Sequence, residues 1–135
     1  MASLTSPGLD YYKIEVDEQK KLIKSVWLRP VHGHEIIAGA TRLYEVLRDT
    51  KFERAIADAR LITSVSADIK GWLSYDFFEL LSSTQLKKLA RVIPAQELVR
   101  QELVQVAANA QQRGVVRFQV NSFLNPGEAL SWLAS

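Results

Sequence analysis

The sequence contains no cysteine among its 135 residues. This absence excludes disulfide bonds, thiol catalysis and zinc or iron–sulfur sites with cysteine ligands. Long apolar runs are also missing, and no segment approaches the ~18 consecutive apolar residues of a membrane-spanning helix. Residues 1–10 have neither the basic start nor the apolar stretch of a secretory signal, and they are rich in Ser, Thr, Pro and Gly. We therefore expect a flexible N-terminal tail at 1–10.

The chain also lacks a strong charge of either sign. Residues 1–67 carry 10 basic and 9 acidic side chains, and residues 68–135 carry 7 and 6, so each half has a net charge of +1. Without a basic stripe, the sequence does not indicate nucleic-acid binding. A composition of 47% hydrophobic and 24% charged residues is typical of a soluble globule, and the length predicts one domain, at 11–135. We expect a cytoplasmic location.

Hydrophobic periodicity predicts strands that alternate with helices. Residues 11–16 and 22–28 form two strands joined by a polar break of hairpin length, which makes them antiparallel. Further strands are predicted at 52–59, 88–93 and 115–120, and helices at 33–48, 66–81, 95–113 and 126–135. The order ββαβαβαβα requires crossover connections, so we predict an α/β fold with a mixed sheet of about five strands and packed helices.

Two capping patterns support the predicted helix starts. Ser66 precedes an acidic first turn, and Asn125 is followed by Pro126 and, three positions on, by Glu128. The helix that begins at Pro126 is too short to persist alone in water. We therefore expect Trp132 to be largely buried, as the residue that docks this helix.

Four segments resemble the SpoIIAA-like fold of STAS domains, in particular small stand-alone bacterial proteins with STAS/SEC14 descriptions. They are Ala57–Arg60 (ADAR), Ser66–Trp72 (SADIKGW), Leu86–Pro94 (LKKLARVIP) and Phe123–Leu133 (FLNPGEALSWL). The resemblance implies mainly the SpoIIAA-like fold. Together with the absence of a catalytic constellation, it favours a regulatory role without catalysis. The Asp-Ser-Ser-Gly-type phosphoacceptor of anti-anti-sigma factors is absent, since this chain has Thr63-Ser64-Val65-Ser66 there. That departure argues against partner switching driven by phosphorylation.

The carboxyl end of the third strand provides the candidate ligand site. Asp58 and Arg60 lie there, at the edge where open α/β sheets usually bind ligands. Ser64 and Ser66 precede a helix, whose free N–H groups suit an anion or a phosphorylated hydroxyl. We predict these four residues as a ligand or anion site, with both serines as candidate phosphoacceptors. The alternative is structural, with an Asp–Arg pair that ties the strand end to a loop and a serine that caps the helix.

Two other polar groups carry weaker functional interpretations. His32, His34 and Glu35 form the single metal-like cluster in the sequence, but Gly33 favours a loop at the start of a helix, so we predict neither a metal nor a cofactor. Arg91 belongs to a basic group with Lys87 and Lys88. We expect this group to be a solvated surface rather than a lipid or phosphate site.

Six aromatic residues are candidates for the lining of an apolar cavity, although most are expected in the core: Trp27, Trp72, Phe77, Phe78, Phe123 and Trp132. Adjacent helical residues point about 100° apart. Phe77 and Phe78 therefore should not share one buried face, and we expect one ring near Tyr75 to be exposed.

Three functions compete. The first is a regulatory or protein-interaction domain without catalysis, whose partner is another protein or a second copy in a homodimer. The second is a carrier or sensor of a small apolar or lipid-like ligand. The third, an enzyme, lacks a pair of activated groups that can be named. An apolar cavity would favour the carrier, a flat aromatic patch the interaction domain, and a cleft that gathers Asp58, Arg60, His32 and His34 the enzyme.

Overall fold

A computed structural model of the protein describes residues 3–5 and 9–135 and shows a mixed six-stranded sheet covered by helices. The strands are β1 (Ser3–Thr5), β2 (Tyr12–Asp17), β3 (Leu22–Trp27), β4 (Arg54–Asp58), β5 (Lys88–Val92) and β6 (Gln119–Phe123). The helices are α1 (Gly33–Thr50), α2 (Ala67–Trp72), α3 (Phe78–Ser82), α4 (Glu97–Gln112) and α5 (Pro126–Ala134), with a π-helical turn η1 (Leu73–Phe77) between α2 and α3. The predicted α/β class with a mixed sheet is confirmed.

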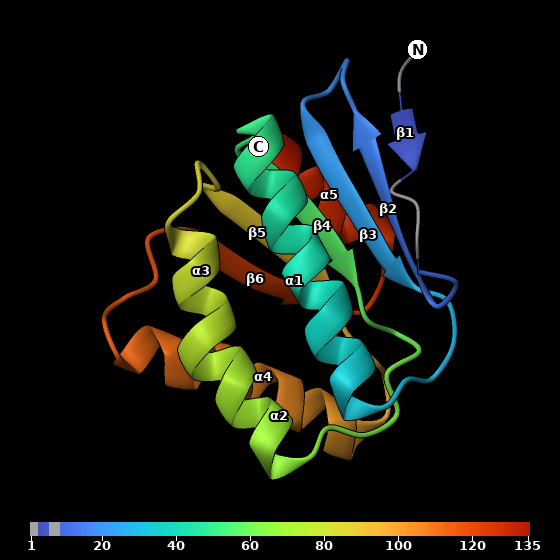
Figure 1. Ribbon diagram of the computed structural model, residues 1–135, viewed down its shortest axis with the longest axis vertical. Coiled ribbons are helices and arrows are strands. Elements are labelled where there is room, and N and C mark those ends of the chain that lie inside the picture. The colour runs from blue at the N-terminus through green and yellow to red at the C-terminus, as the bar shows by residue number, and fades with distance from the viewer. Residues whose placement is uncertain (1–2, 6–8) are drawn as a thin grey trace.

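The strands lie in the sheet in the same order as in the sequence. β1, β2 and β3 pair antiparallel, whereas β3, β4, β5 and β6 pair parallel. Crossovers of constant hand between successive neighbouring strands place their helices on the same side of the sheet. Figure 1 accordingly shows α1, the α2–η1–α3 segment and α4 on one face, and α5 alone on the other face.

The two faces of the sheet have separate cores. The larger core fills the space between the sheet and α1 to α4, and it contains Ile23, Leu47, Leu89 and Phe78. The smaller core lies under α5, where Ala129 and Leu133 pack on buried side chains of β3, β4 and β5. Alternation along each strand divides the residues between these cores. No helix within residues 3–5 and 9–135 has both the length and the apolar character needed to cross a membrane.

The predicted caps are present at both helices. The Ser66 hydroxyl accepts a hydrogen bond from the Ile69 N–H at 3.4 Å, and the Asn125 side chain accepts one from the Glu128 N–H at 2.9 Å. Gly114, just beyond α4, adopts a left-handed φ of 73°, the conformation for which glycine is favoured at the end of a helix.

Two strand predictions differ from the structure. The last strand was expected at 115–120 but lies at 119–123, because residues 115–118 are used to cross from α4 to the sheet. Phe118 ends this crossing in the larger core, 5.7 Å from the ring of Phe78. The predicted tail at 1–10 contains β1, which pairs with β2 through the backbone and carries no sequence signal of its own. The rest of this tail up to Gly8 lies outside the described residues.

The expected exposure of Phe77 or Phe78 is wrong. Both rings are buried, since η1 interrupts the regular α-helical rotation directly before Phe78. The exposed aromatic residue is Tyr75, with 53% of its surface accessible and the Arg113 guanidinium 4.6 Å from its ring centre. The flat Phe77–Phe78 patch that would have favoured a protein-interaction surface is therefore not formed.

Trp132 is also less buried than expected. It lies half-buried at the rim of the smaller core, 5.9 Å from the Phe123 ring and beneath the ammonium group of Lys88. Leu133 and Ala129 are the fully buried residues of α5. Lys88 also donates a hydrogen bond to the Ser135 carbonyl, so a positive charge lies at the carboxyl end of the helix, where the helix dipole favours it.

Candidate ligand cavity

A cavity of about 90 Å³ lies between the sheet and the helices of the larger core. Its volume falls between the ~10–15 Å³ that admits one water molecule and the ~150 Å³ of a cavity that accepts benzene. Trp27, Ala59 and Ile93 line it at the carboxyl ends of three adjacent strands. In open α/β sheets this is the edge at which ligands bind.

The floor of the cavity is formed by alanines of β4 and of the segment directly after it. Ala55, Ala57 and Ala59 lie on the side of the larger core, whereas Ile56 packs in the smaller core on the other face. Ala57 and Ala59 line the cavity and stay partly accessible although β4 is a central strand. A methyl side chain does not reach the helices above, so these positions leave the space open.

Aromatic rings form the wall beside β2 and β3. Tyr12 and Trp27 both line the cavity, and their rings pack 4.1 Å apart. Gly39 of α1 allows this arrangement, because a Cβ atom at that position would lie 2.5 Å from the Trp27 indole. Burial raises the pKa of Tyr12, so the phenol stays protonated and presents a hydroxyl.

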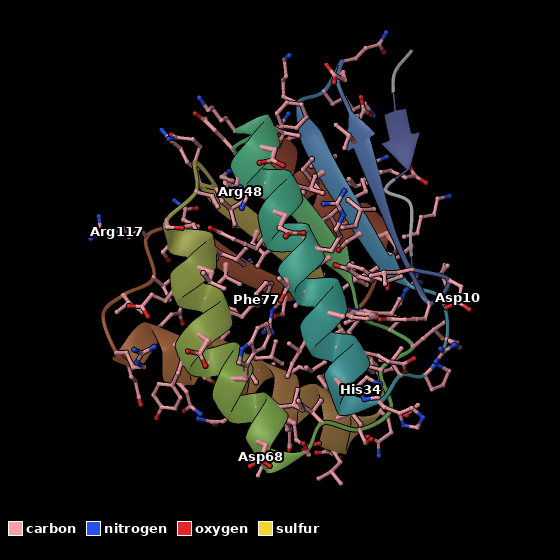
Figure 2. The ribbon with its side chains drawn as sticks, viewed as in Figure 1. Asp10, His34, Arg48, Asp68, Phe77 and Arg117 are labelled. Carbon is pink, nitrogen blue, oxygen red and sulfur yellow. The ribbon has the colours of Figure 1, made fainter. Side chains whose placement is uncertain are left out.

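The π-helical turn forms part of the opposite wall. Leu73 and Phe77, the first and last residues of η1, line the cavity together with Phe78. Figure 2 shows Phe77 between α1 and the α2–η1–α3 segment. Ser74 fixes this turn to α4, because its hydroxyl donates a hydrogen bond to the Val106 carbonyl at 3.3 Å. Such turns inside α-helices are frequent at functional sites.

Arg91 is the charged member of the cavity lining. Only 9% of its surface is accessible, so its expected place on a solvated surface is wrong. Its guanidinium donates hydrogen bonds to the Leu103 carbonyl at 2.8 Å and to the Ser122 hydroxyl at 3.1 Å. Its buried Nε atom has no hydrogen-bond partner, and no carboxylate in the described part of the chain forms an ion pair with it.

Burial alone shifts the titration of Arg91. Desolvation lowers the pKa of its guanidinium to about 10, which leaves the group positively charged at pH 7. An isolated buried charge is costly, and natural proteins normally pair it. A buried polar atom without a partner, in a side chain that lines a largely apolar cavity, therefore calls for an explanation.

A sequence signal for Arg91 exists in the run Leu89–Ile93. Side chains alternate between the two faces of a strand, so Arg91 shares its face with Leu89 and Ile93. Lys88 lies on the other face, over Trp132. Charge alone does not distinguish residues 87, 88 and 91, because it takes no account of the face of the strand on which each side chain lies. The alternation pattern separates the buried cation Arg91 from Lys88, which is half-buried on the opposite face.

Asp58 and Arg60, predicted at the same edge of the sheet, form a local ion pair. The Asp58 carboxylate accepts hydrogen bonds from the Arg60 guanidinium at 2.7 Å and from the Arg60 backbone N–H at 3.1 Å. Asp58 lies with Ile56 on the α5 side of β4, whereas Ala57 faces the cavity. The sheet thus separates the Asp58 carboxylate from the cavity.

Ser64 and Ser66 lie in the loop that follows β4, with exposed side chains. Ile62 and Val65 of the same loop are buried and line the cavity. The loop therefore closes one end of the cavity with apolar residues and presents its serines outward. Ser66 serves as a helix cap, and both serines remain predicted phosphoacceptors.

In the His32–His34–Glu35 cluster, the Glu35 carboxylate binds neighbouring groups of the protein. Glu35 accepts hydrogen bonds from the Arg29 guanidinium at 2.8 Å and from the His32 backbone N–H at 2.8 Å. These bonds lower the pKa of Glu35 to about 2. The imidazole rings stack 6.3 Å apart. Within residues 3–5 and 9–135, no group of three or more His, Asp or Glu side chains is arranged to hold a metal ion.

Comparisons of the chain with models of protein families, with curated proteins and with solved structures give no match. A proposed function therefore rests on features of the structure itself, namely the cavity, its alanine floor and the buried guanidinium of Arg91.

Proposed function

We propose that the protein is a sensor or carrier, without catalytic activity, of a small and largely apolar ligand bound in the cavity beside β4. The observation that carries this proposal is a 90 Å³ space lined by apolar side chains at the carboxyl ends of the parallel strands. Protein interiors are normally close-packed, so a space of this size in the main core is unusual. The alanines at its floor favour the interpretation that the space is a binding site and not a packing defect.

The predicted family is compatible with this role. The order of elements from β2 to α5 is the order expected of a SpoIIAA-like domain, and we propose that the chain has this fold. We also propose that the protein has a regulatory role in the cytoplasm of a bacterium. A ligand-dependent change in the loop of Ser64 and Ser66 would then be the signal read by a protein partner or a second copy, since Ile62 and Val65 connect that loop to the cavity.

The test is an NMR titration of the ¹⁵N-labelled protein with butan-1-ol, a small uncharged probe. We expect saturable shifts of amides around Ala57 and Leu89. Ala57→Val adds two carbon atoms above the floor and should weaken the binding of butan-1-ol by about tenfold or more, because it occupies the ligand's space.

Asp58→Asn is the matched control, because it alters the next residue on the opposite face of the same strand and should leave the titration unchanged. Equal shifts in the Ala57→Val and wild-type proteins would contradict the proposal.

A further inference from the structure

The cavity has a polar end, which defines the kind of ligand further. Arg91 of β5 is its charged lining residue among the described residues, and its Nε atom is buried without a partner. An arginine side chain carries five N–H donors, and two of them serve the Leu103 carbonyl and the Ser122 hydroxyl. For the other three donors, including Nε–H, the described residues provide no hydrogen-bond acceptor.

The register of the sheet places this charge beside the open floor. Ser25 of β3 pairs with Ala57 of β4, and Ala57 pairs with Arg91 of β5. The three residues form a row on one face, in which a small alanine lies between two polar side chains. Adjacent strands are about 4.8 Å apart, so a ligand above Ala57 lies within reach of the Arg91 side chain. The Ser25 hydroxyl is also buried on this face, beside the phenol of Tyr12.

We propose that the cavity binds a short-chain carboxylate, whose carboxylate group pairs with the Arg91 guanidinium and whose apolar chain lies over Ala57. This inference rests on the proposed function and names the ligand class for the same cavity. The planar fork of a guanidinium matches a carboxylate in a bidentate pair, and the ligand supplies the negative charge that the protein lacks there.

The size and charge of the cavity limit the ligand. By proportion with benzene, whose six non-hydrogen atoms occupy a cavity of ~150 Å³, a 90 Å³ space accepts roughly three to five non-hydrogen atoms. This range includes acetate and propionate. A phosphate ester carries more charge and more acceptor atoms than one guanidinium and an apolar lining can satisfy. A single carboxylate balances the single cation.

The test compares three probes on the ¹⁵N-labelled full chain by NMR: sodium propionate, butan-1-ol and inorganic phosphate. We expect propionate to bind about tenfold more tightly than butan-1-ol, which is the gain from about one charge-assisted hydrogen bond. The Nε–H resonance of Arg91 should move with propionate and stay in place with phosphate.

Variants at position 91 separate the charge from the cavity. Arg91→Met should remove the tenfold preference for propionate and leave butan-1-ol binding unchanged. Arg91→Gln, which keeps a donor and loses the charge, is the second variant and should behave likewise. Arg60→Met removes an exposed arginine outside the cavity and is the control, with wild-type preference expected.

The outcomes distinguish the two proposals. If the wild type binds neither butan-1-ol nor propionate, the proposed function fails together with this inference. If butan-1-ol binds but propionate binds no more tightly, or if Arg91→Met keeps the preference, only the carboxylate assignment is overturned. Binding of phosphate with a shift of the Arg91 Nε–H resonance would overturn it in favour of a different anion.

Discussion

The Arg91 side chain has a proposed role in ligand binding, and its burial lowers the stability of the folded protein. Its guanidinium has lost nearly all contact with water, and two hydrogen bonds to neutral groups are its compensation. A buried charge without a counter-ion destabilises the folded state. The ligand that we propose would supply this counter-ion, so the cost is borne mainly by the free protein.

The first prediction follows from that cost. Arg91→Met keeps an unbranched chain of similar length and removes the buried charge, so the variant should be more stable than the wild type by roughly 1–2 kcal/mol. Urea melts followed by circular dichroism measure the difference in the free energy of unfolding. A loss of stability of similar size would mean that the Leu103 and Ser122 hydrogen bonds outweigh the cost of burying the charge.

At the residue scale, chemistry read from sequence neighbours was less informative than alternation along a strand. The motif Asp58-Ala59-Arg60 attracts attention because it contains an acid and a base, yet these two side chains bind each other. The cavity is formed by the alanines between and before them. Small residues leave no chemical signal in a sequence, and a space becomes visible only when the surrounding helices are placed.

At the scale of the elements, the N-terminus of α1 is stabilised by electrostatic interactions of Glu35. Glu35 in its first turn accepts a hydrogen bond from the His32 N–H and pairs with Arg29 in the segment that leads into the helix. Only 13% of the Glu35 side chain is accessible. This arrangement ties the end of β3 to the helix that covers the cavity, and it depends on the ionised carboxylate.

The second prediction concerns pH. Because the Arg29 pair and the His32 N–H lower the pKa of Glu35 to about 2, from an ordinary value of 4.5, the ionised carboxylate stabilises the folded state above about pH 4.5. This contribution is lost as the pH falls from about 4.5 to 2. Glu35→Gln should melt at a lower temperature than the wild type at pH 7, and the gap should close over that range.

Thermal melts at intervals between pH 2 and 7 provide the measurement. Glu45→Gln, which alters a more accessible ion pair with Arg42 further along α1, is the matched control and should stay close to the wild type throughout. A gap between Glu35→Gln and the wild type that is the same at pH 7 and pH 2 would show that the carboxylate charge is not involved.

Most elements were predictable because their signals are local. Alternation defined β2 and β3, and the caps at Ser66 and Asn125 placed two helix starts. The π-helical turn was not predictable, since it depends on how Phe77 and Phe78 pack against α1 and Phe118. The same holds for β6, whose start is set by the distance from α4 to the edge of the sheet rather than by the apolar residues Val115 and Val116.

At the scale of the whole molecule, a single sheet separates two cores of unequal size. The larger core contains the cavity, whereas the smaller core is closed by α5 alone. Arg54 reaches across the α5 side of the sheet and donates hydrogen bonds to the carbonyls of Leu133 and Lys20. Strands β3, β4 and β5 contribute side chains to both cores, so neither core can lose its packing without disturbing the other.

The last prediction tests this coupling with the tryptophans as local probes. Trp27 lies in the larger core and Trp132 at the rim of the smaller core. A Trp72→Phe/Trp132→Phe variant reports fluorescence from Trp27, and a Trp27→Phe/Trp72→Phe variant reports from Trp132. Within each variant, the urea midpoint from fluorescence should equal the midpoint from circular dichroism, because a shared sheet makes unfolding a single cooperative transition. If the Trp132 signal changes at a lower urea concentration than the circular dichroism of the same variant, α5 detaches before the sheet unfolds. The smaller core would then be a separate unit, and ligand binding in the larger core would leave α5 unaffected.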